Sequence, residues 1–130
     1  MSYPEANVLV TTAETIPGYT IVEVLGIVVG ITVRSRGLGG NLMAALRSLV
    51  GGEIKEFVEM AEQARMQALI RMIDRAKELG ANAVVNIRFD SNELNQSMDE
   101  IIAYGTAVKV AKNSDDFTSR IYLHYFLKTF

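Results

Sequence analysis

The chain has 130 residues, of which 49% are hydrophobic and 22% charged, a balance typical of a single globular domain rather than of a disordered chain. Thirteen Lys and Arg residues against fifteen Asp and Glu residues give a formal net charge of −2, which offers no electrostatic basis for nucleic-acid binding. The sequence has no cysteine, no secretory signal pattern and no apolar run approaching the ~20 residues that span a bilayer, so we expect a cytoplasmic protein.

The first third of the chain has the pattern of β-strands. Residues 8–12 form a short β-rich run, and Ile16-Pro17-Gly18 is typical of a turn, because proline fixes φ and glycine accepts a positive φ. Residues 20–33 are dominated by β-branched side chains, with glycines at positions 26 and 30. This run is long for one strand, and an internal glycine often marks a bulge. The sequence therefore predicts one bent strand, or two strands joined near Gly26–Gly30.

A glycine-rich loop and a short helix follow. The loop covers residues 34–40, and Asn41 is a suitable N-cap for a helix over residues 42–49, which Gly51-Gly52 ends.

A long helix is predicted over residues 53–79, where no proline or glycine occurs and Gly80 stands at the position of a left-handed C-cap. Met60, Met66 and Ile70 lie away from its main apolar stripe, so the helix has more apolar surface than packing on one sheet requires. The stripe has three- and four-residue spacing and consists of Ile54, Phe57, Ala61, Ala64, Ala68, Met72, Ala76 and Leu79.

Two strands and a polar loop are predicted after the long helix. Apolar residues alternate with polar ones over residues 83–90, residues 91–99 are polar, and residues 100–110 read as the partner strand. We therefore expect an α+β domain over residues 1–112, with one long and one short helix packed on one face of a largely antiparallel sheet.

The C-terminal segment, residues 113–130, is rich in aromatic side chains. It holds five of the ten Phe and Tyr residues, and as a helix it would place Phe117, Ile121 and Tyr125 on one side. Because burying a large apolar side chain is worth about 1.5–3 kcal/mol, we expect this tail to dock on a neighbouring subunit, on a second ring or on the open face of its own domain.

The sequence predicts no catalytic, cofactor-binding or metal-ligating residue. The only histidine is His124 and there is no cysteine, so neither a nucleophilic triad nor a zinc or copper site can be assembled from the usual side chains. The glutamates at positions 53, 56, 59 and 62 are read as the solvated start of the long helix. An anion site is the one candidate that remains: a glycine loop follows a strand and opens a helix, next to two arginines. It would consist of Arg34, Arg36, Gly37, Gly39 and Gly40.

Several segments resemble the YbjQ-like family, small bacterial and archaeal proteins that carry a heavy-metal-binding label. The similar segments are Val10-Thr11-Thr12, Ile16-Pro17-Gly18, Ile21, Gly26–Gly30, Gly51-Gly52-Glu53, Gly80–Val85 and Tyr104–Val108, within residues 7–110. The resemblance implies a dodecin-like α+β subunit that assembles into a closed homo-oligomeric ring of five subunits, or ten in two rings. It implies no established activity, and no metal ligand is carried over to this chain.

Two hypotheses about function follow. The first is a homo-oligomeric structural or small-ligand-binding module whose partner is itself. The alternative is a metal- or anion-binding protein that acts through carboxylates or through the Arg34–Gly40 loop. An enzyme with a serine or threonine nucleophile comes third, because no residue pattern supports it.

Overall fold

A computed structural model describes residues 8–35 and 55–113. In chain order it contains the strands β1 (Leu9–Val10) and β2 (Tyr19–Ser35), the helix α2 (Lys55–Glu78), and the strands β3 (Ala83–Asn95) and β4 (Met98–Lys112). The predicted short helix at 42–49 and the tail from residue 114 onward lie outside the described residues.

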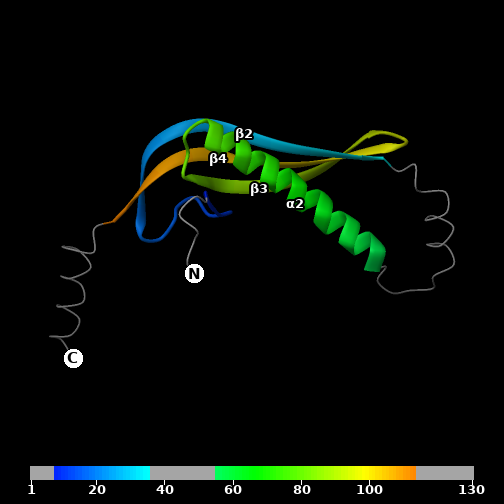
Figure 1. The fold of residues 1–130 in the computed structure, drawn as a ribbon, viewed down its shortest axis with the longest axis horizontal. Helices are drawn as coiled ribbons and strands as arrows, with labels where there is room; N and C mark the ends of the chain where they lie inside the picture. The colour runs from blue at the N-terminus through cyan, green and yellow to red at the C-terminus, as the bar shows by residue number, and fades with distance from the viewer. Residues whose placement is uncertain (1–7, 36–54, 114–130) are drawn as a thin grey trace, which may run out of the picture.

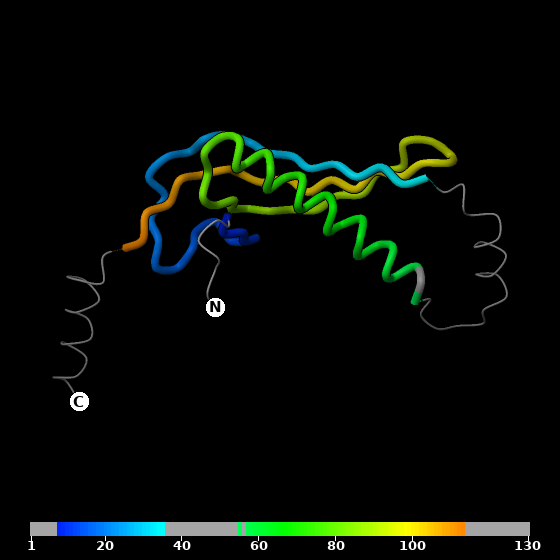
Figure 2. The backbone as a smooth tube through the Cα atoms, viewed as in Figure 1, coloured from blue at the N-terminus to red at the C-terminus, as the bar shows by residue number. Residues whose placement is uncertain are grey.

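The four strands form one sheet in the order β1-β3-β4-β2, with α2 packed on one face (Figure 1). β4 pairs antiparallel with both β2 and β3, whereas the two-residue β1 pairs parallel with β3. The predicted α+β class with a largely antiparallel sheet is therefore confirmed. The smooth trace shows the long β3–β4 hairpin extending well beyond β1 (Figure 2).

β2 is one bent strand, which decides between the two readings of its sequence. Its pairing with β4 shifts between Ile21 and Glu23 and again between Val24 and Gly26. Gly26 has φ 135°, a conformation that side-chain-bearing residues rarely adopt. The strand therefore bends at these irregularities without breaking.

The predicted polar loop at 91–99 is wrong, because β3 continues through Asn95 and β4 begins at Met98. The ladder persists with Ser91 opposite Ile101 and Asn92 opposite Glu100. Backbone hydrogen bonding does not require apolar side chains, so the polar sequence of a hairpin that is exposed on both faces predicts a loop. The turn itself is stabilised by the Asn95 side chain, whose Oδ1 accepts hydrogen bonds from the Ser97 amide at 2.8 Å and the Ser97 hydroxyl at 2.9 Å.

A bulge in β3 also changes which side chains face the helix. The register with β4 shifts between Val85 and Arg88, and Asn86 has φ 55°. As a result Ala83 and Val85 lie on the face opposite α2, whereas Ile87 packs into the core beneath the helix. The simple alternation predicted over residues 83–90 therefore does not hold across the bulge.

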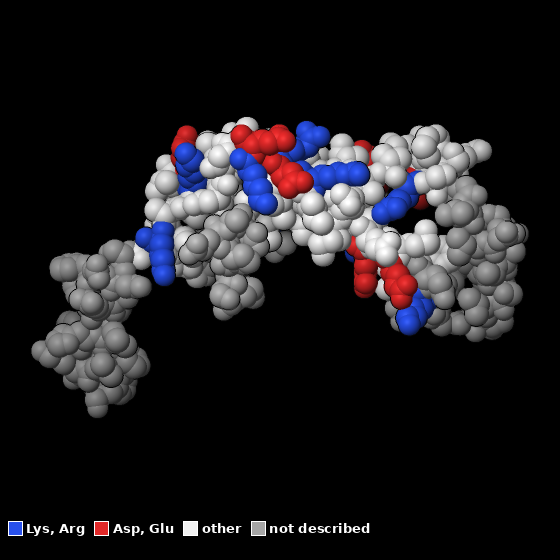
Figure 3. Space-filling view, in the orientation of Figure 1, with Lys and Arg blue, Asp and Glu red and all other residues white. Residues whose placement is uncertain are grey.

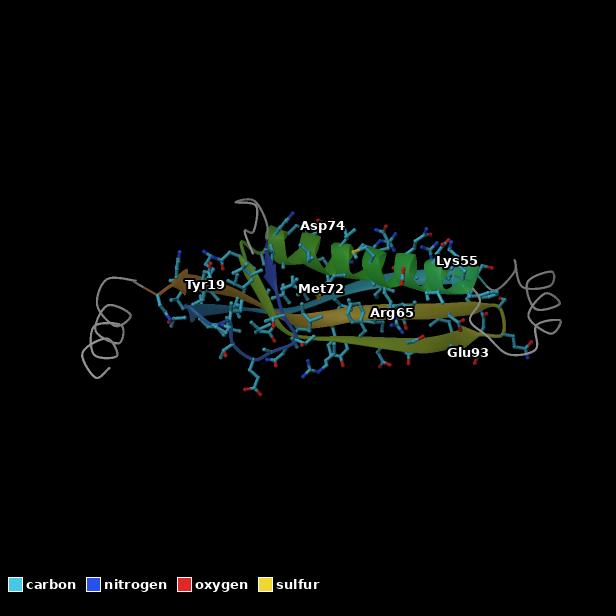
Figure 4. The ribbon with its side chains drawn as sticks, turned by 90° about the horizontal axis from the view of Figure 1, so that it is seen from below. Tyr19, Lys55, Arg65, Met72, Asp74 and Glu93 are labelled. Atoms are coloured by element: carbon cyan, nitrogen blue, oxygen red, sulfur yellow. The ribbon has the colours of Figure 1, made fainter. Side chains whose placement is uncertain are left out.

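The helix packs through small residues that bring it close to β2. Ala64, Ala68, Met72 and Ala76 are buried, as predicted. Ala61 is exposed and Leu79 is 46% exposed, so these two do not belong to the buried stripe. A Cβ added to Gly30 would overlap the carbonyl oxygen of Ala68 and the amide nitrogen of Met72, so only glycine fits beneath this turn. Figure 4 shows Met72 between α2 and the sheet and Asp74 on the far side of the helix.

The turn from α2 into β3 is closed by Gly80 and Asn82. Gly80 has φ 82°, and the Ala81 amide donates to the Ala76 carbonyl at 3.0 Å, which ends the helix in a left-handed cap. The Asn82 side chain then accepts from the Val110 amide at 2.7 Å and donates to the Val110 carbonyl at 2.9 Å. Asn82 thus pairs with β4 as a strand peptide would, at the point where β3 has not yet begun.

Two apolar clusters hold the domain together, one on each face of the sheet. The cluster beneath α2 includes Val28, Ala68, Met72, Val84 and Ala103. The opposite face has a smaller cluster, which the turn after β1 helps to cover. Its members are Leu9, Ala83, Val85, Val108 and Val110, with Ile16, Tyr19 and Ile21 packed against them.

Candidate functional site

The most prominent feature of the described surface is an apolar area on the sheet face opposite α2. Residues directly opposite each other in neighbouring strands point to the same face, so the register defines its members. We call it the open-face patch: Val24, Ile27, Val29, Ile31, Val33, Ile102 and Tyr104. Ile27 is 79% exposed, Val24 67% and Val33 48%. No described element covers these side chains.

The edge of the sheet next to this patch is also free in the described part of the chain. β2 pairs only with β4, and no charged residue or proline occurs between Glu23 and Arg34. Natural proteins usually protect such an edge with charges, bulges or a covering element, because it can pair with another chain. One protecting contact is present: Arg71 Nη1 donates to the Ile31 carbonyl at 2.6 Å.

A shallow depression of about 510 Å³ lies where α2 meets this edge. Ile31, Arg71, Asp74, Arg75 and Glu78 line it. Two cationic and two anionic side chains alternate there, so it favours neither an anion nor a cation. Figure 3 shows the same intermixing of acidic and basic residues on the face it displays.

The predicted anion site is described only at Arg34. This residue lies exposed near the end of β2, directly opposite Asp99 of β4. Arg36, Gly37, Gly39 and Gly40 lie outside the described residues, so the structure does not bring the predicted set together. An acidic residue opposite Arg34 weakens the attraction of this end of the strand for an anion.

Within the described ranges, no group of three His, Cys, Asp or Glu side chains is close enough to hold a metal ion. Glu59 and Glu62 are exposed on α2, as predicted, while Glu53, the Glu56 side chain and His124 lie outside the described residues. No described helix combines the length and hydropathy needed to cross a membrane.

Sequence reasoning found the surplus apolar surface on α2 but missed the open-face patch. Met60, Met66 and Ile70 are 38%, 56% and 44% exposed, as their positions away from the stripe predict. In β2, however, a run dominated by β-branched residues is typical of a strand buried on both faces. Only the structure, in which α2 packs on one face of the sheet and the exposed side chains of β2 lie on the other, shows that one face is uncovered.

Comparisons with known proteins agree with the resemblance noted in the sequence. A UPF0145 protein of Sulfurisphaera tokodaii is 74% identical over 113 residues, which cover 87% of this chain and 99% of the relative. A UPF0145 protein of Saccharolobus solfataricus is 74% identical over 114 residues, covering 88% of this chain and all of the relative.

A solved structure from Pediococcus pentosaceus, a protein of unknown function in the DUF74 family, is similar in fold. Its TM-score is 0.53 at 17% identity, with 80% of this chain and 98% of that chain covered. At such low identity the likeness concerns the fold alone. A family model described as "Putative heavy-metal-binding" matches residues 8–111. Because this match spans most of the chain, the protein belongs to the YbjQ-like family of UPF0145 proteins.

Proposed function

We propose that this protein is a homo-oligomeric structural or small-ligand-binding module, in which another copy of the chain covers the open-face patch. The observation that carries the proposal is the exposure of Ile27, Val24 and Val33 on the uncovered face of the sheet. Contiguous apolar patches of this kind on small proteins mark interaction surfaces.

The energetics support a partner for this face. Fully burying a Val or Ile side chain is worth about 1.5–3 kcal/mol, and the patch has five such residues on β2 alone. A chain of 130 residues without disulfides has a modest core, so subunit contacts would add substantially to its stability. The free edge of β2 borders the patch and would be covered in the same contact.

The number of subunits comes from the family resemblance, which implies a ring of five, or ten in two rings. Such a ring creates clefts between subunits, and these are the places where a small ligand would bind. The tail, residues 113–130, would add to the contacts within this assembly. We assign no catalytic residue, and we predict no nucleic-acid partner and a cytoplasmic location.

The alternative is metal or anion binding, which the family description favours. It would use carboxylates or the Arg34–Gly40 loop. We rank it second because Arg34 lies opposite Asp99 and because the carboxylates of the described residues do not converge.

Light scattering of the full chain tests the first proposal. We expect a mass that is a multiple of 14.3 kDa at low micromolar concentration, five-fold or ten-fold if the resemblance holds for assembly. Ile27→Glu should shift the mass toward the monomer, because a carboxylate would be buried against apolar side chains. Gln63→Glu, on the exposed surface of α2, is the matched control and should leave the mass unchanged.

Two outcomes would contradict the proposal. A wild-type mass near 14.3 kDa would show that the chain does not self-associate. An oligomer that Ile27→Glu leaves intact would show that the open-face patch is not the contact. Circular dichroism of the variant distinguishes dissociation from unfolding.

A further inference from the structure

The sheet has two outer edges, and the described residues protect them unequally. Along β3, the residues after β1 continue the pairing, since two of their carbonyls accept hydrogen bonds from β3 amides. Farther along β3, charged side chains bond the backbone itself. Arg88 Nη1 donates to the Ile87 carbonyl at 2.8 Å, and Asp90 Oδ1 accepts from the Ser91 amide at 2.8 Å. A covering segment and charged side chains are devices by which natural sheets prevent pairing with another chain.

The edge formed by β2 lacks these devices in its central part. β2 pairs only with β4, and residues 24–33 contain neither a charged residue nor a proline. From Ile27 to Val33 every residue is Ile, Val, Thr or Gly. Short, uncharged segments of high β-propensity are the ones that pair between chains when they are exposed.

The register shows which backbone groups of β2 point away from the sheet. The Ile31 carbonyl accepts a hydrogen bond from Arg71 of α2 rather than from β4, so it points outward. In an antiparallel pair, successive residues point alternately toward the partner strand and away from it. The register with β4 has no shift from Gly26 to Ser35, so the amides and carbonyls of Val29 and Val33 point outward as well.

Arg71 stands at the middle of this edge. Ile31 is the central one of the three outward-pointing residues, and Arg71 Nη1 lies 2.6 Å from its carbonyl oxygen. The amide of an added strand would bond the same oxygen at about 2.9 Å, so the strand and the guanidinium compete for it. A strand laid along the edge would also remove the charged guanidinium from water, which is unfavourable unless the charge is paired.

The contact is built so that it can open. Arg71 is exposed, and it reaches the edge through a long side chain with several rotatable bonds. Its release would leave three consecutive outward-pointing residues of β2, at positions 29, 31 and 33, without any charged group against their backbone. A second copy of the chain presents the same uncharged strand with the same outward-pointing groups, so each copy offers the other an extended partner for pairing.

We propose that Arg71 gates the β2 edge. When bonded to the Ile31 carbonyl, it keeps the edge from pairing with an extended strand of a second copy of the chain. When it is released, the edge is open to that pairing along Val29–Val33. The gate acts on a subunit whose edge is uncovered, so it does not depend on the open-face patch binding a second copy.

Two variants of the full chain test the gate. Arg71→Ala removes the contact, and Arg75→Ala is the matched control. Arg75 lines the same depression and is also exposed, but within the described part of the chain its side chain bonds no backbone group of β2. The formation of large assemblies is followed by light scattering and thioflavin T fluorescence at one protein concentration. We expect Arg71→Ala to form β-rich assemblies several-fold faster than the wild type, and Arg75→Ala to match the wild type.

Hydrogen exchange identifies the contact within these assemblies. Assembled Arg71→Ala protein is exposed to deuterated water, dissolved under conditions that quench exchange, and compared with the soluble variant. We expect the amides of Val29, Ile31 and Val33 to be protected in the assemblies and to exchange faster in the soluble protein. Protection at these positions distinguishes pairing along the edge from the aggregation of unfolded chains.

Two results would overturn the gate. If Arg71→Ala assembled no faster than Arg75→Ala, the contact with Ile31 would not restrain the edge. If the amides of Val29, Ile31 and Val33 exchanged freely in the assemblies, the chains would be joined elsewhere. The mass of the Ile27→Glu variant reports on the open-face patch separately, so either proposal can fail alone.

Discussion

Gly30→Ala offers a direct test of the helix–sheet contact. The added methyl group would lie far inside the 3.0 Å separation that real Cβ atoms keep from other atoms, and the atoms it meets belong to the backbone of α2 at Ala68 and Met72. A side chain could rotate away, but a helix backbone has to move as a whole, taking Ala68 and Met72 out of the core.

The expected cost lies at the upper end of the range for overpacked cores. Such substitutions usually destabilise by about 1–3 kcal/mol, and a clash with backbone supports a value of about 3 kcal/mol. Because whole domains are stable by about 5–15 kcal/mol, this is a large fraction of the total. With a urea dependence of about 1–3 kcal/mol per molar, the midpoint of unfolding should fall by about 1–3 M.

Equilibrium unfolding in urea, followed by far-UV circular dichroism at one fixed protein concentration, measures the effect. The control is Gly18→Ala, where φ is 84° but no atom lies within 4 Å of the added Cβ. It should cost about 1–2 kcal/mol from backbone conformation alone. If Gly30→Ala shifted the midpoint no more than Gly18→Ala does, the close approach of α2 to β2 would be refuted.

Three further predictions concern single residues and metal binding. Asn82→Ala should destabilise the domain by about 1–3 kcal/mol in the same urea assay, because the amide and the carbonyl of Val110 both lose their hydrogen-bond partner. An unchanged midpoint of unfolding would contradict this. Thr32→Val should stabilise the domain by about 1 kcal/mol, because the Thr32 hydroxyl is buried without a hydrogen-bond partner and valine has nearly the same shape. A loss of stability would show that the hydroxyl does have a hydrogen-bond partner. Calorimetric titration of untagged protein with zinc or copper should show no binding tighter than about 1 μM, equivalent to about −8 kcal/mol, and stoichiometric tight binding would overturn the ranking of the two functions.

The parts of the fold that depend on local sequence were predictable. Gly80 ends α2, and the small residues of the helix stripe face the sheet, because capping and helical periodicity act over a few residues. The β3–β4 hairpin beyond Ser91 was not predictable in this way. Its two strands are joined by backbone hydrogen bonds between β3 and β4, and their side chains show no pattern that predicts this pairing.

The candidate site shows the same division. The apolar surplus of α2 at Met66 and Ile70 follows from helical spacing, whereas the exposure of Ile27 depends on which face of the sheet α2 covers. That packing is set by long-range contacts, which a local pattern does not encode. The bulge at Asn86 could not be predicted either, because apolar and polar residues alternate regularly along this part of the sequence. The bulge places Ile87 on the face of the sheet opposite Val85.

The pairing of Asn82 with Val110 has a consequence for the dynamics of the domain. The Val110 amide is protected from solvent by a side chain that sits in the turn between α2 and β3, rather than by a neighbouring strand. Its hydrogen can therefore exchange with solvent whenever that turn opens, even while β4 stays paired with β2. In a native-state exchange experiment, this one amide reports on the fraying of the helix C-terminus from a position near the end of an inner strand.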